Sequence, residues 1–270
     1  MLTRKRLPSR SFSHFTEDLQ SRGRYTFCKQ EAISALNISE NAFHKSVGRL
    51  VLEKRLIRIV NEFYAIIPFE YKNSGGMPAT HYIDSLMKFE QQPYYVGVLS
   101  AAALHGAAHQ SPQELQIITS KPLSLIKAGR SRIRFLIKGK VLETPIQAMK
   151  TPSGYIQVST PEATSFDLFR YPKAASGLSN IATVLKELSE AMDAEKLAKL
   201  ASVTESSYVQ RLGYLLDLAG AKKLTPPLIA CLKKHHRWDY ISLRPGRKSG
   251  SDTRDPKWRL IINDTVESDV

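Results

Sequence analysis

The sequence predicts a mixed α/β (α+β) protein in which an N-terminal winged helix-turn-helix is followed by a larger mixed α/β domain. In the first seventy residues, three segments with helical spacing precede a hairpin pattern, and beyond residue 78 strand-like runs are interspersed with amphipathic helices. Between these regions, residues 68–78 contain Asn-Ser-Gly-Gly, which is typical of a flexible linker. We therefore expect two domains, residues 1–72 and residues 73–270.

The first region has the order of elements of a winged helix. Residues 12–19 and 29–36 carry apolar side chains at the spacing of two short helices, with a strand expected between them at residues 25–27. Asn37 tolerates a left-handed turn, and Ser39 is placed to cap a third helix with its hydroxyl. Two short helices joined by such a turn form a helix-turn-helix.

The third helix divides into an apolar face and a polar face. The apolar side chains at helical spacing are Phe43, Val47, Leu50 and Val51. The outward side chains expected at the base edges of a DNA groove are Asn41, His44, Lys45 and Arg49. Asparagine pairs well with adenine and arginine with guanine. The alternative is that these side chains are only solvated or contact another protein.

Two β-branched and aromatic runs, residues 56–60 and 63–67, predict the hairpin of the wing, with Asn61 and Glu62 at its turn. The residues expected to contact DNA phosphates beside it are Lys54, Arg55 and Arg58. Phosphate contacts position a duplex without reading its sequence.

The larger domain is expected to combine helices and strands. Helices are expected at residues 78–89, 93–109, 178–192, 194–201 and 208–219, and strands at residues 117–119, 133–137 and 155–158. A further helix is expected to begin at Thr160 and Pro161, which have the order of an N-cap and a first-turn proline. Small residues dominate the 93–109 segment, so its backbone is expected to pack closely against a neighbour.

The sequence also contains a candidate second basic surface. Arg130, Arg132 and Arg134 alternate along a predicted strand, where like charges repel one another unless an anion lies among them. A DNA backbone, an acidic protein partner and a solvated sheet edge protected against aggregation all remain open as explanations. Nearer the C-terminus, the same basic character is found at Lys233, Lys234 and Arg237.

The charge balance favours a polyanionic partner. Lysine and arginine number 39 against 25 aspartates and glutamates, which gives a formal net charge of +14. The excess lies in residues 1–72, with 13 basic and 7 acidic residues, and in residues 221–260, with 11 and 3. No apolar run is long enough to span a bilayer, and the two cysteines form no framework, so we expect a cytoplasmic protein without a membrane partner.

No catalytic, cofactor or metal site is predicted. The glycine-rich phosphate-binding patterns are absent, and His105 and His109 lack the glutamate and the third ligand of a metal motif. We therefore expect a protein that is not an enzyme. The competing hypotheses are a nuclease-like enzyme with a winged-helix targeting domain and a winged-helix module that binds another protein.

Three motifs that follow the winged helix resemble those of a known family. Residues 95–106 (YVGVLSAAALHG), 159–168 (STPEATSFDL) and 210–216 (QRLGYLL) are similar to the AbiEi-type antitoxins of abortive-infection and type IV toxin-antitoxin systems. The likeness extends from about residue 12 to residue 246. The wing turn lacks glycine, and the basic C-terminal stretch through Trp258 is longer than the family pattern requires.

This resemblance implies a DNA-binding transcriptional autorepressor that is also an antitoxin. The implied partners are double-stranded DNA, as an operator with inverted repeats upstream of its own operon, and an AbiEii-type nucleotidyltransferase toxin that is counteracted without a stable complex. One winged helix reads one half-site, so a dimer is expected on such DNA.

Overall fold

The structure is a computed structural model that describes residues 11–73, 76–107, 112–234, 238–247 and 253–266. Contacts divide the chain into two compact units: Met1–Tyr94, Gln113–Leu142 and Ala148–Gln157 form the first, and Tyr95–Pro112, Glu143–Gln147 and Val158–Val270 form the second. This division does not test whether residues 1–72 fold on their own, so that boundary stays a prediction.

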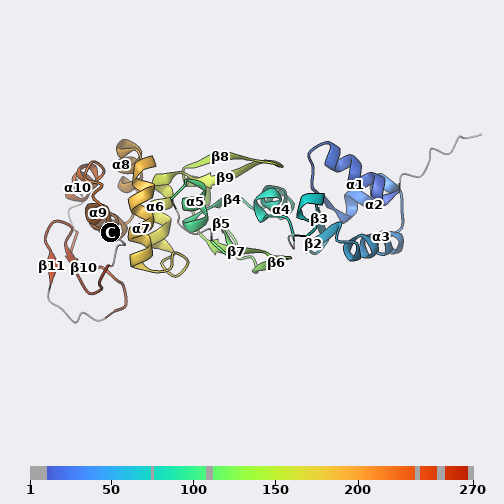
Figure 1. The fold of residues 1–270 in the computed structure, drawn as a ribbon. Coiled ribbons are helices and arrows are strands. Elements are labelled where there is room, and N and C mark those ends of the chain that lie inside the picture. The colour runs from blue at the N-terminus through green and yellow to red at the C-terminus, as the bar shows by residue number, and fades with distance from the viewer. Residues whose placement is uncertain (1–10, 74–75, 108–111, 235–237, 248–252, 267–270) are drawn as a thin grey trace, which may run out of the picture. The chain divides into compact units, whose positions relative to one another are not determined.

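The first unit begins with a winged helix. Its elements are α1 (Phe12–Ser21), β1 (Thr26–Cys28), α2 (Lys29–Leu36), α3 (Glu40–Leu52), β2 (Leu56–Val60) and β3 (Phe63–Ile66). The strands pair antiparallel in the order β1-β3-β2, and Figure 1 shows the three helices gathered beside them. The predicted winged helix-turn-helix is confirmed.

The turn between α2 and α3 forms through the residues that predicted it. Asn37 ends α2 in the left-handed region, with a φ of 51°. The Ser39 hydroxyl then accepts a hydrogen bond from the amide of Ala42 at 3.3 Å and so caps α3. Because both signals act within a few residues, the helix-turn-helix is specified locally.

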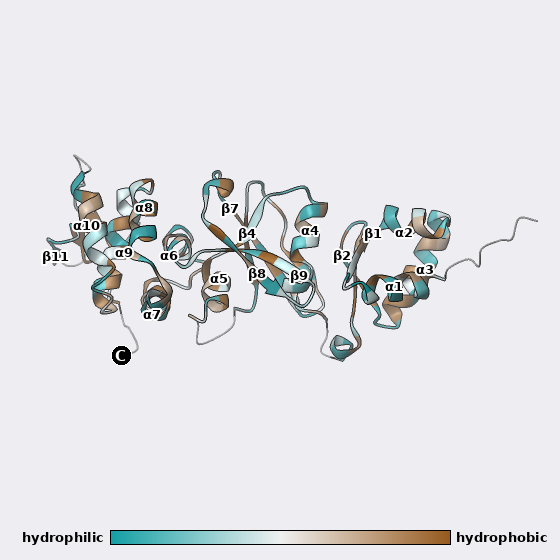
Figure 2. Cartoon of the chain, turned by 90° about the horizontal axis from the view of Figure 1, so that it is seen from above, coloured by the Kyte–Doolittle hydropathy of each residue, from teal (hydrophilic) through white to brown (hydrophobic). Residues whose placement is uncertain are grey.

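An aromatic core holds the helices against the strands. The rings of Phe12, Phe15, Phe27, Phe43 and Tyr64 pack with neighbouring centroids 5.5 to 5.9 Å apart. Such aromatic pairs add about 0.5–1.5 kcal/mol each beyond the burial of their area. Figure 2 shows hydrophobic and hydrophilic residues alternating along α1 and α3, as expected when one face is buried. The polar face of α3 is thereby held in solvent.

Two details of this region differ from expectation. Val51, expected in the buried stripe of α3, is 40% exposed, because eight residues after Phe43 an α-helix has turned about 80° away from the stripe. The end of the expected flexible linker is packed, since Met77 is buried and its carbonyl accepts a hydrogen bond from Ser131 Oγ at 2.9 Å. Residues 74–75 lie outside the described ranges.

A six-stranded mixed sheet follows, in the order β6-β7-β5-β4-β9-β8. Its strands are β4 (Tyr94–Val96), β5 (Leu115–Thr119), β6 (Ile126–Ala128), β7 (Ser131–Ile137), β8 (Ile146–Thr151) and β9 (Gly154–Ser159). The strands β5 and β7 run parallel, as do β4 and β9, whereas β6 and β7 are antiparallel. The three predicted strands are confirmed, whereas β6 and β8 were not predicted.

The helix predicted at residues 93–109 is wrong at its start. Tyr94–Val96 forms the buried strand β4, and helix α5 covers only Val98–Leu104. Three consecutive buried residues that are aromatic or β-branched fit a strand with both faces covered. The helix predicted at residues 78–89 also differs, since a 3-10 turn, Ala79–His81, precedes α4 (Ile83–Phe89).

The second unit is mainly helical. Besides α5, its helices are α6 (Pro161–Arg170), α7 (Leu178–Leu188), α8 (Ala194–Ser202), α9 (Ser206–Leu218) and α10 (Thr225–Lys234). Helix α6 packs against α5, α7, α8 and α9, and all its residues from Glu162 to Phe169 are buried. As predicted, the Thr160 hydroxyl caps α6, accepting from the Ala163 amide at 3.3 Å. Helix α10 was not predicted.

The C-terminal segment folds back onto α9. It forms a small sheet of β10 (Ile241–Ser242), β12 (Leu260–Ile261) and β11 (Arg254–Asp255), in that order. The Gln210 side-chain amide donates to the carbonyls of Asp239, Trp258 and Arg259 at 2.9 to 3.2 Å. The Arg211 guanidinium donates to the carbonyls of Ser242 and Leu243. The last of the three family-like motifs therefore binds the C-terminal backbone.

Trp258 also packs the C-terminal segment against α9. Trp258 is fully buried, and its indole N–H donates to Asp217 at 2.6 Å. Its ring lies directly over Gly213, so that a Cβ at this position would overlap the ring atoms. Only glycine lets α9 and the Trp258 ring approach so closely.

The two helical glycines at positions 213 and 48 should respond oppositely to alanine. We expect Gly213→Ala to lower the free energy of unfolding by about 3 kcal/mol or more, because the methyl group displaces the Trp258 ring. Gly48→Ala, whose new Cβ meets no atom within 4 Å in exposed α3, should raise it by about 0.5–1 kcal/mol. Chemical denaturation followed by circular dichroism measures both. Equal effects of the two substitutions would contradict this account of Trp258.

Candidate nucleic-acid interface

The four residues predicted to read DNA bases lie on the solvent face of α3. Asn41, His44, Lys45 and Arg49 are all exposed. Arg49 Nε lies 3.8 Å from Glu53 Oε1, one helical turn away, and both side chains are largely solvated. An exposed ion pair of this kind contributes at most about 0.5 kcal/mol, so a phosphate or base can displace it. The structure places these residues on one face, and their contact with DNA stays a prediction.

The three residues predicted to contact DNA phosphates differ in exposure and in their ion pairs. Lys54 is exposed at the end of α3, in the left-handed region, and Arg58 is exposed on β2. Arg55 is only half-exposed, because its guanidinium lies 3.3 Å from Glu17 on α1 and 4.0 Å from Glu53. Arg55 therefore joins α1 to the start of the wing, a role that its sequence position does not reveal.

The wing has the predicted two-residue turn. Glu62 takes a φ of 61°, where glycine is usual, and its carbonyl accepts a hydrogen bond from the Lys29 amide at 2.8 Å. The Lys29 ammonium lies 3.4 Å from the Glu62 carboxylate and 3.1 Å from Glu40. These contacts attach the wing to the starts of α2 and α3, which explains how the turn forms without glycine.

Of the three arginines predicted to form a second basic surface, Arg132 and Arg134 lie on β7. Arg132 is directly opposite Lys127 of β6, and both side chains are exposed. Arg134 Nε donates to Glu114 Oε2 at 2.5 Å, and this bond lowers the pKa of the Glu114 carboxyl. Arg130 is exposed in the turn before β7. Strand β6 pairs with β7 only along residues 131–133, so β6 is the edge strand there and all three explanations of the basic residues stay open.

The C-terminal cations belong to the second unit. Lys233 and Lys234 are exposed in the last turn of α10, where positive charge is favoured by the helix dipole. Arg237 lies outside the described residues. Whether these side chains contact DNA stays a prediction.

The first two family-like motifs are joined by buried hydrogen bonds. The Tyr95 hydroxyl donates to Asp167 at 2.9 Å, and both side chains are fully buried. His105 Nε2 lies 2.7 Å from the Ser159 carbonyl oxygen, and Ser159 Oγ lies 2.7 Å from the Thr164 hydroxyl. Burial and the neighbouring Asp167 raise the pKa of Tyr95. The motif residues therefore form an internal network that connects β4, α5, β9 and α6.

The described residues contain neither a metal-binding cluster nor a membrane-spanning helix. Within the described ranges, no three His, Cys, Asp or Glu side chains form a group that could hold a metal ion, and His109 falls outside those ranges. Among the described helices, none has the length and hydropathy of a membrane span.

Comparison with known proteins supports the resemblance. Residues 95–218 match the family model of the AbiEi antitoxin C-terminal domain, which confirms the AbiEi-type resemblance for that part of the chain. No curated protein matches the chain. The crystal structure of the RV2827C protein from Mycobacterium tuberculosis is similar, with a TM-score of 0.67 and 17% identity over 95% of this chain and 92% of that chain. At this identity, the likeness shows a shared mixed α/β fold.

Removing the Tyr95 hydroxyl should destabilise the protein. We expect Tyr95→Phe to lower the free energy of unfolding by about 1–3 kcal/mol, because a buried carboxylate loses a donor. Urea denaturation measures the change. Tyr155→Phe, at a 59% exposed tyrosine, is the matched control and should stay within about 0.5 kcal/mol of the parent.

The same tyrosine should contribute to the loss of stability in alkali. Its pKa is higher in the folded than in the unfolded state, where it is near 10, so its contribution is complete below pH 10 and is lost as the pH rises further. Between about pH 9 and 11, Tyr95→Phe should therefore lose less unfolding free energy than the parent protein. Parallel curves for the two proteins would contradict the raised pKa.

Proposed function

We propose that this chain, whose residues 95–218 match the AbiEi antitoxin C-terminal domain, is the DNA-binding antitoxin of a type IV toxin-antitoxin system. In this proposal, the winged helix binds inverted repeats upstream of its own operon and represses transcription. The matched domain counteracts an AbiEii-type nucleotidyltransferase toxin without forming a stable complex. The proposal describes a regulator rather than an enzyme.

The main support for DNA binding is that the polar face of α3 is exposed to solvent. A complete winged helix presents Asn41, Lys45 and Arg49 outward, while the aromatic core fixes the opposite face. Amide and guanidinium groups on a recognition helix are suited to base edges in the major groove. Beside it, Lys54 and Arg58 are exposed and suited to phosphates.

Further phosphate contacts are proposed on the β6–β7 hairpin, which belongs to the same compact unit as the winged helix. Strand β6 contacts β2 of the wing. Lys127 and Arg132 stand directly opposite each other, an arrangement that repulsion disfavours in water and a phosphate favours. Affinity should fall steeply with salt, because each neutralised phosphate releases about one counterion.

Arg49→Ala should reduce sequence-specific binding. We expect a loss of about 1–3 kcal/mol on the operator and a much smaller loss on random DNA, because a base contact is removed. Fluorescence anisotropy with both duplexes at two salt concentrations measures this. Lys88→Ala, which removes an exposed cation on α4, is the matched control and should change neither affinity. Equal losses on both duplexes would assign Arg49 to phosphate, and no loss on either would exclude α3 as the reading helix.

Glu53→Gln should strengthen DNA binding. Glu53 lies 3.8 Å from Arg49 and 4.0 Å from Arg55, so its carboxylate competes with the DNA for both guanidinium groups. We expect affinity to rise about threefold at low salt, with the gain shrinking as salt screens the pair. Glu190→Gln makes the same charge change at an exposed position of the second unit and should have little effect. A weaker complex with Glu53→Gln would mean that Glu53 positions the arginines for binding.

A further inference from the structure

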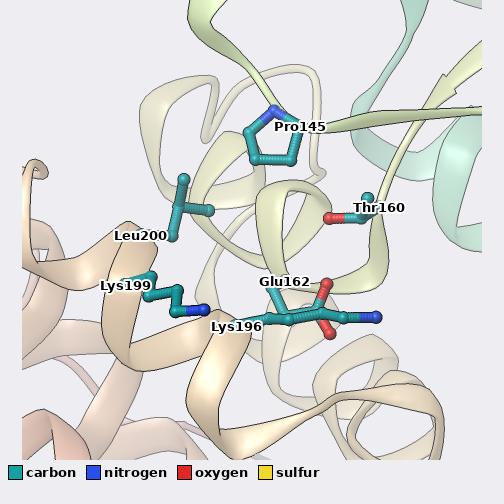
Figure 3. A pocket seen from close by; sticks show the side chains of 6 residues that line it. All are labelled: Pro145, Thr160, Glu162, Lys196, Lys199 and Leu200. Carbon is teal, nitrogen blue, oxygen red and sulfur yellow. The ribbon is translucent and has the colours of Figure 1, made fainter.

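The hollow between α6 and α8 of the second unit has its polar groups already engaged. It has a volume of about 280 Å³ and is lined by Pro145, Thr160, Glu162, Lys196, Lys199 and Leu200 (Figure 3). The Glu162 carboxylate accepts a hydrogen bond from the Asp193 amide at 2.8 Å. A hydrogen bond from the Lys196 amide and the charges of Lys196 and Lys199 lower the pKa of Asp193. A surface that is available to a ligand is found instead in the C-terminal segment.

The small C-terminal sheet has a buried side and an exposed side. Leu260 of β12 lies directly opposite Asp255 of β11 and is fully buried. Arg254 lies opposite Ile261, one residue further along β12, so it points to the other side of the sheet, and it is exposed. Arg259, which precedes the buried Leu260, is exposed as well. The exposed side of this sheet therefore presents two guanidinium groups.

Each of these guanidinium groups lies over an aromatic ring. Cζ of Arg254 is 5.4 Å from the centroid of the Tyr240 ring, and Cζ of Arg259 is 4.5 Å from the centroid of the Trp238 ring. Both distances are within the limit of about 6 Å for a cation–π contact. Tyr240 is 40% exposed, and Trp238 is half-buried. Arg254, Arg259, Tyr240 and Trp238 together form what we call the stacking face.

The backbone of the stacking face is held in place. The Gln210 side chain of α9 donates hydrogen bonds to the carbonyls of Asp239 and Arg259. Arg259 Nη1 donates to the Trp238 carbonyl at 2.7 Å, and the neighbouring Trp258 is fully buried. A surface that is ordered in advance loses little conformational freedom when a ligand binds.

The stacking face is positively charged. Within the described residues, no carboxylate forms an ion pair with Arg254 or Arg259. Asp264 is paired with two other arginines, and Asp255 accepts a hydrogen bond from a backbone amide. Asp239 is exposed between the two aromatic residues, but one carboxylate against two guanidinium groups leaves a positive charge. The face is therefore suited to an anion.

The rings determine which kind of anion fits. Guanidinium groups bind phosphates, and unpaired bases stack on aromatic rings and on guanidinium planes. A duplex keeps its bases paired, so it uses the cations of such a face but not its rings. The side chains of an acidic protein segment also use only the charges. Unpaired bases that a protein can reach in a cell belong mainly to RNA.

We propose that the stacking face binds single-stranded RNA, with bases stacked on Tyr240 and Trp238 and phosphates at Arg254 and Arg259. This activity is separate from the binding of duplex DNA by α3. It also gives a role to the basic C-terminal stretch, which the proposed DNA-binding function does not use.

Fluorescence anisotropy of the full chain with a labelled RNA tests the ligand. The RNA has about twelve nucleotides, which is enough to cover one small binding face, and alternates C and A so that it cannot pair with itself. We expect a dissociation constant of about 1–100 μM that rises with salt. Arg49→Ala, on α3, should leave this affinity within about twofold of the parent value, which separates RNA binding from the proposed DNA binding.

Substitution of Tyr240 tests the location. Tyr240→Leu keeps an apolar side chain but removes the ring, so it should weaken RNA at least about fivefold. The same substitution should not change the affinity for this RNA annealed to its complement. Tyr155→Leu, at another exposed tyrosine, is the matched control and should affect neither.

Substitution of Arg254 gives a second test of the location. Arg254→Gln should weaken the single strand at least about threefold, because a stacked cation is lost. Arg244→Gln removes the same charge from an exposed arginine that is paired with Asp264 at 3.0 Å, and it should have little effect. This pair of variants decides the question if Tyr240→Leu does not fold.

Tryptophan emission reports stacking directly. The chain has two tryptophans, of which Trp258 is fully buried and Trp238 belongs to the stacking face. RNA should therefore quench part of the emission of the parent protein. Trp238→Phe keeps an aromatic ring, so it should still bind RNA but show no quenching.

Four results would overturn the proposal. The first is no binding of the RNA by the parent protein at about 100 μM. The second is an unchanged affinity for the single strand in both Tyr240→Leu and Arg254→Gln. The third is quenching that persists in Trp238→Phe. The fourth is displacement of the RNA by poly-L-glutamate as effectively as by unlabelled RNA of the same total charge, which would mean that the face recognises charge alone.

Discussion

Helix α6 is buried along eight consecutive residues, and the organisation of the second unit follows from this constraint. A polar group inside a protein costs free energy unless it is hydrogen-bonded, and α6 carries several such groups. Asp167 accepts from the hydroxyl of Tyr95, Thr164 bonds to Ser159, and the Ser165 hydroxyl donates to a carbonyl one turn earlier. The first two partners belong to β4 and the end of β9, so the polar side chains of the helix also fix the register of these strands against it.

The parts of the fold that the sequence predicted are those specified by neighbouring residues. Ser39 and Thr160 cap helices within three positions, and this range is short enough to be read directly from the sequence. Strand β4 was mistaken for helix because its strand character depends on β5 and β9, which lie far away in the chain. Similarly, no local pattern indicates that Gln210 meets Trp258, although both residues stood out in the sequence.

For the candidate interface, helical spacing predicted which side chains of α3 face solvent, but it could not predict which cations are already engaged. Arg55 is held by Glu17 of another helix, and Arg134 by Glu114, which lies 20 positions earlier. A count of charges in the sequence does not distinguish these two arginines from Lys45. Lys45, however, makes no ion pair with any described residue. Long-range carboxylates therefore decide how much of a basic sequence is available to a partner, and only coordinates identify them.

The contacts of Gln210 have a consequence for how the protein is made. Its side chain bonds to carbonyls 29, 48 and 49 residues further along the chain. A ribosome that has just synthesised α9 must translate the whole C-terminal segment before the indole of Trp258 can cover Gly213. Until then, α9 exposes apolar surface that the finished protein buries, and such surface is prone to aggregation. Any nascent chain arrested before residue 258 therefore carries an incomplete second unit.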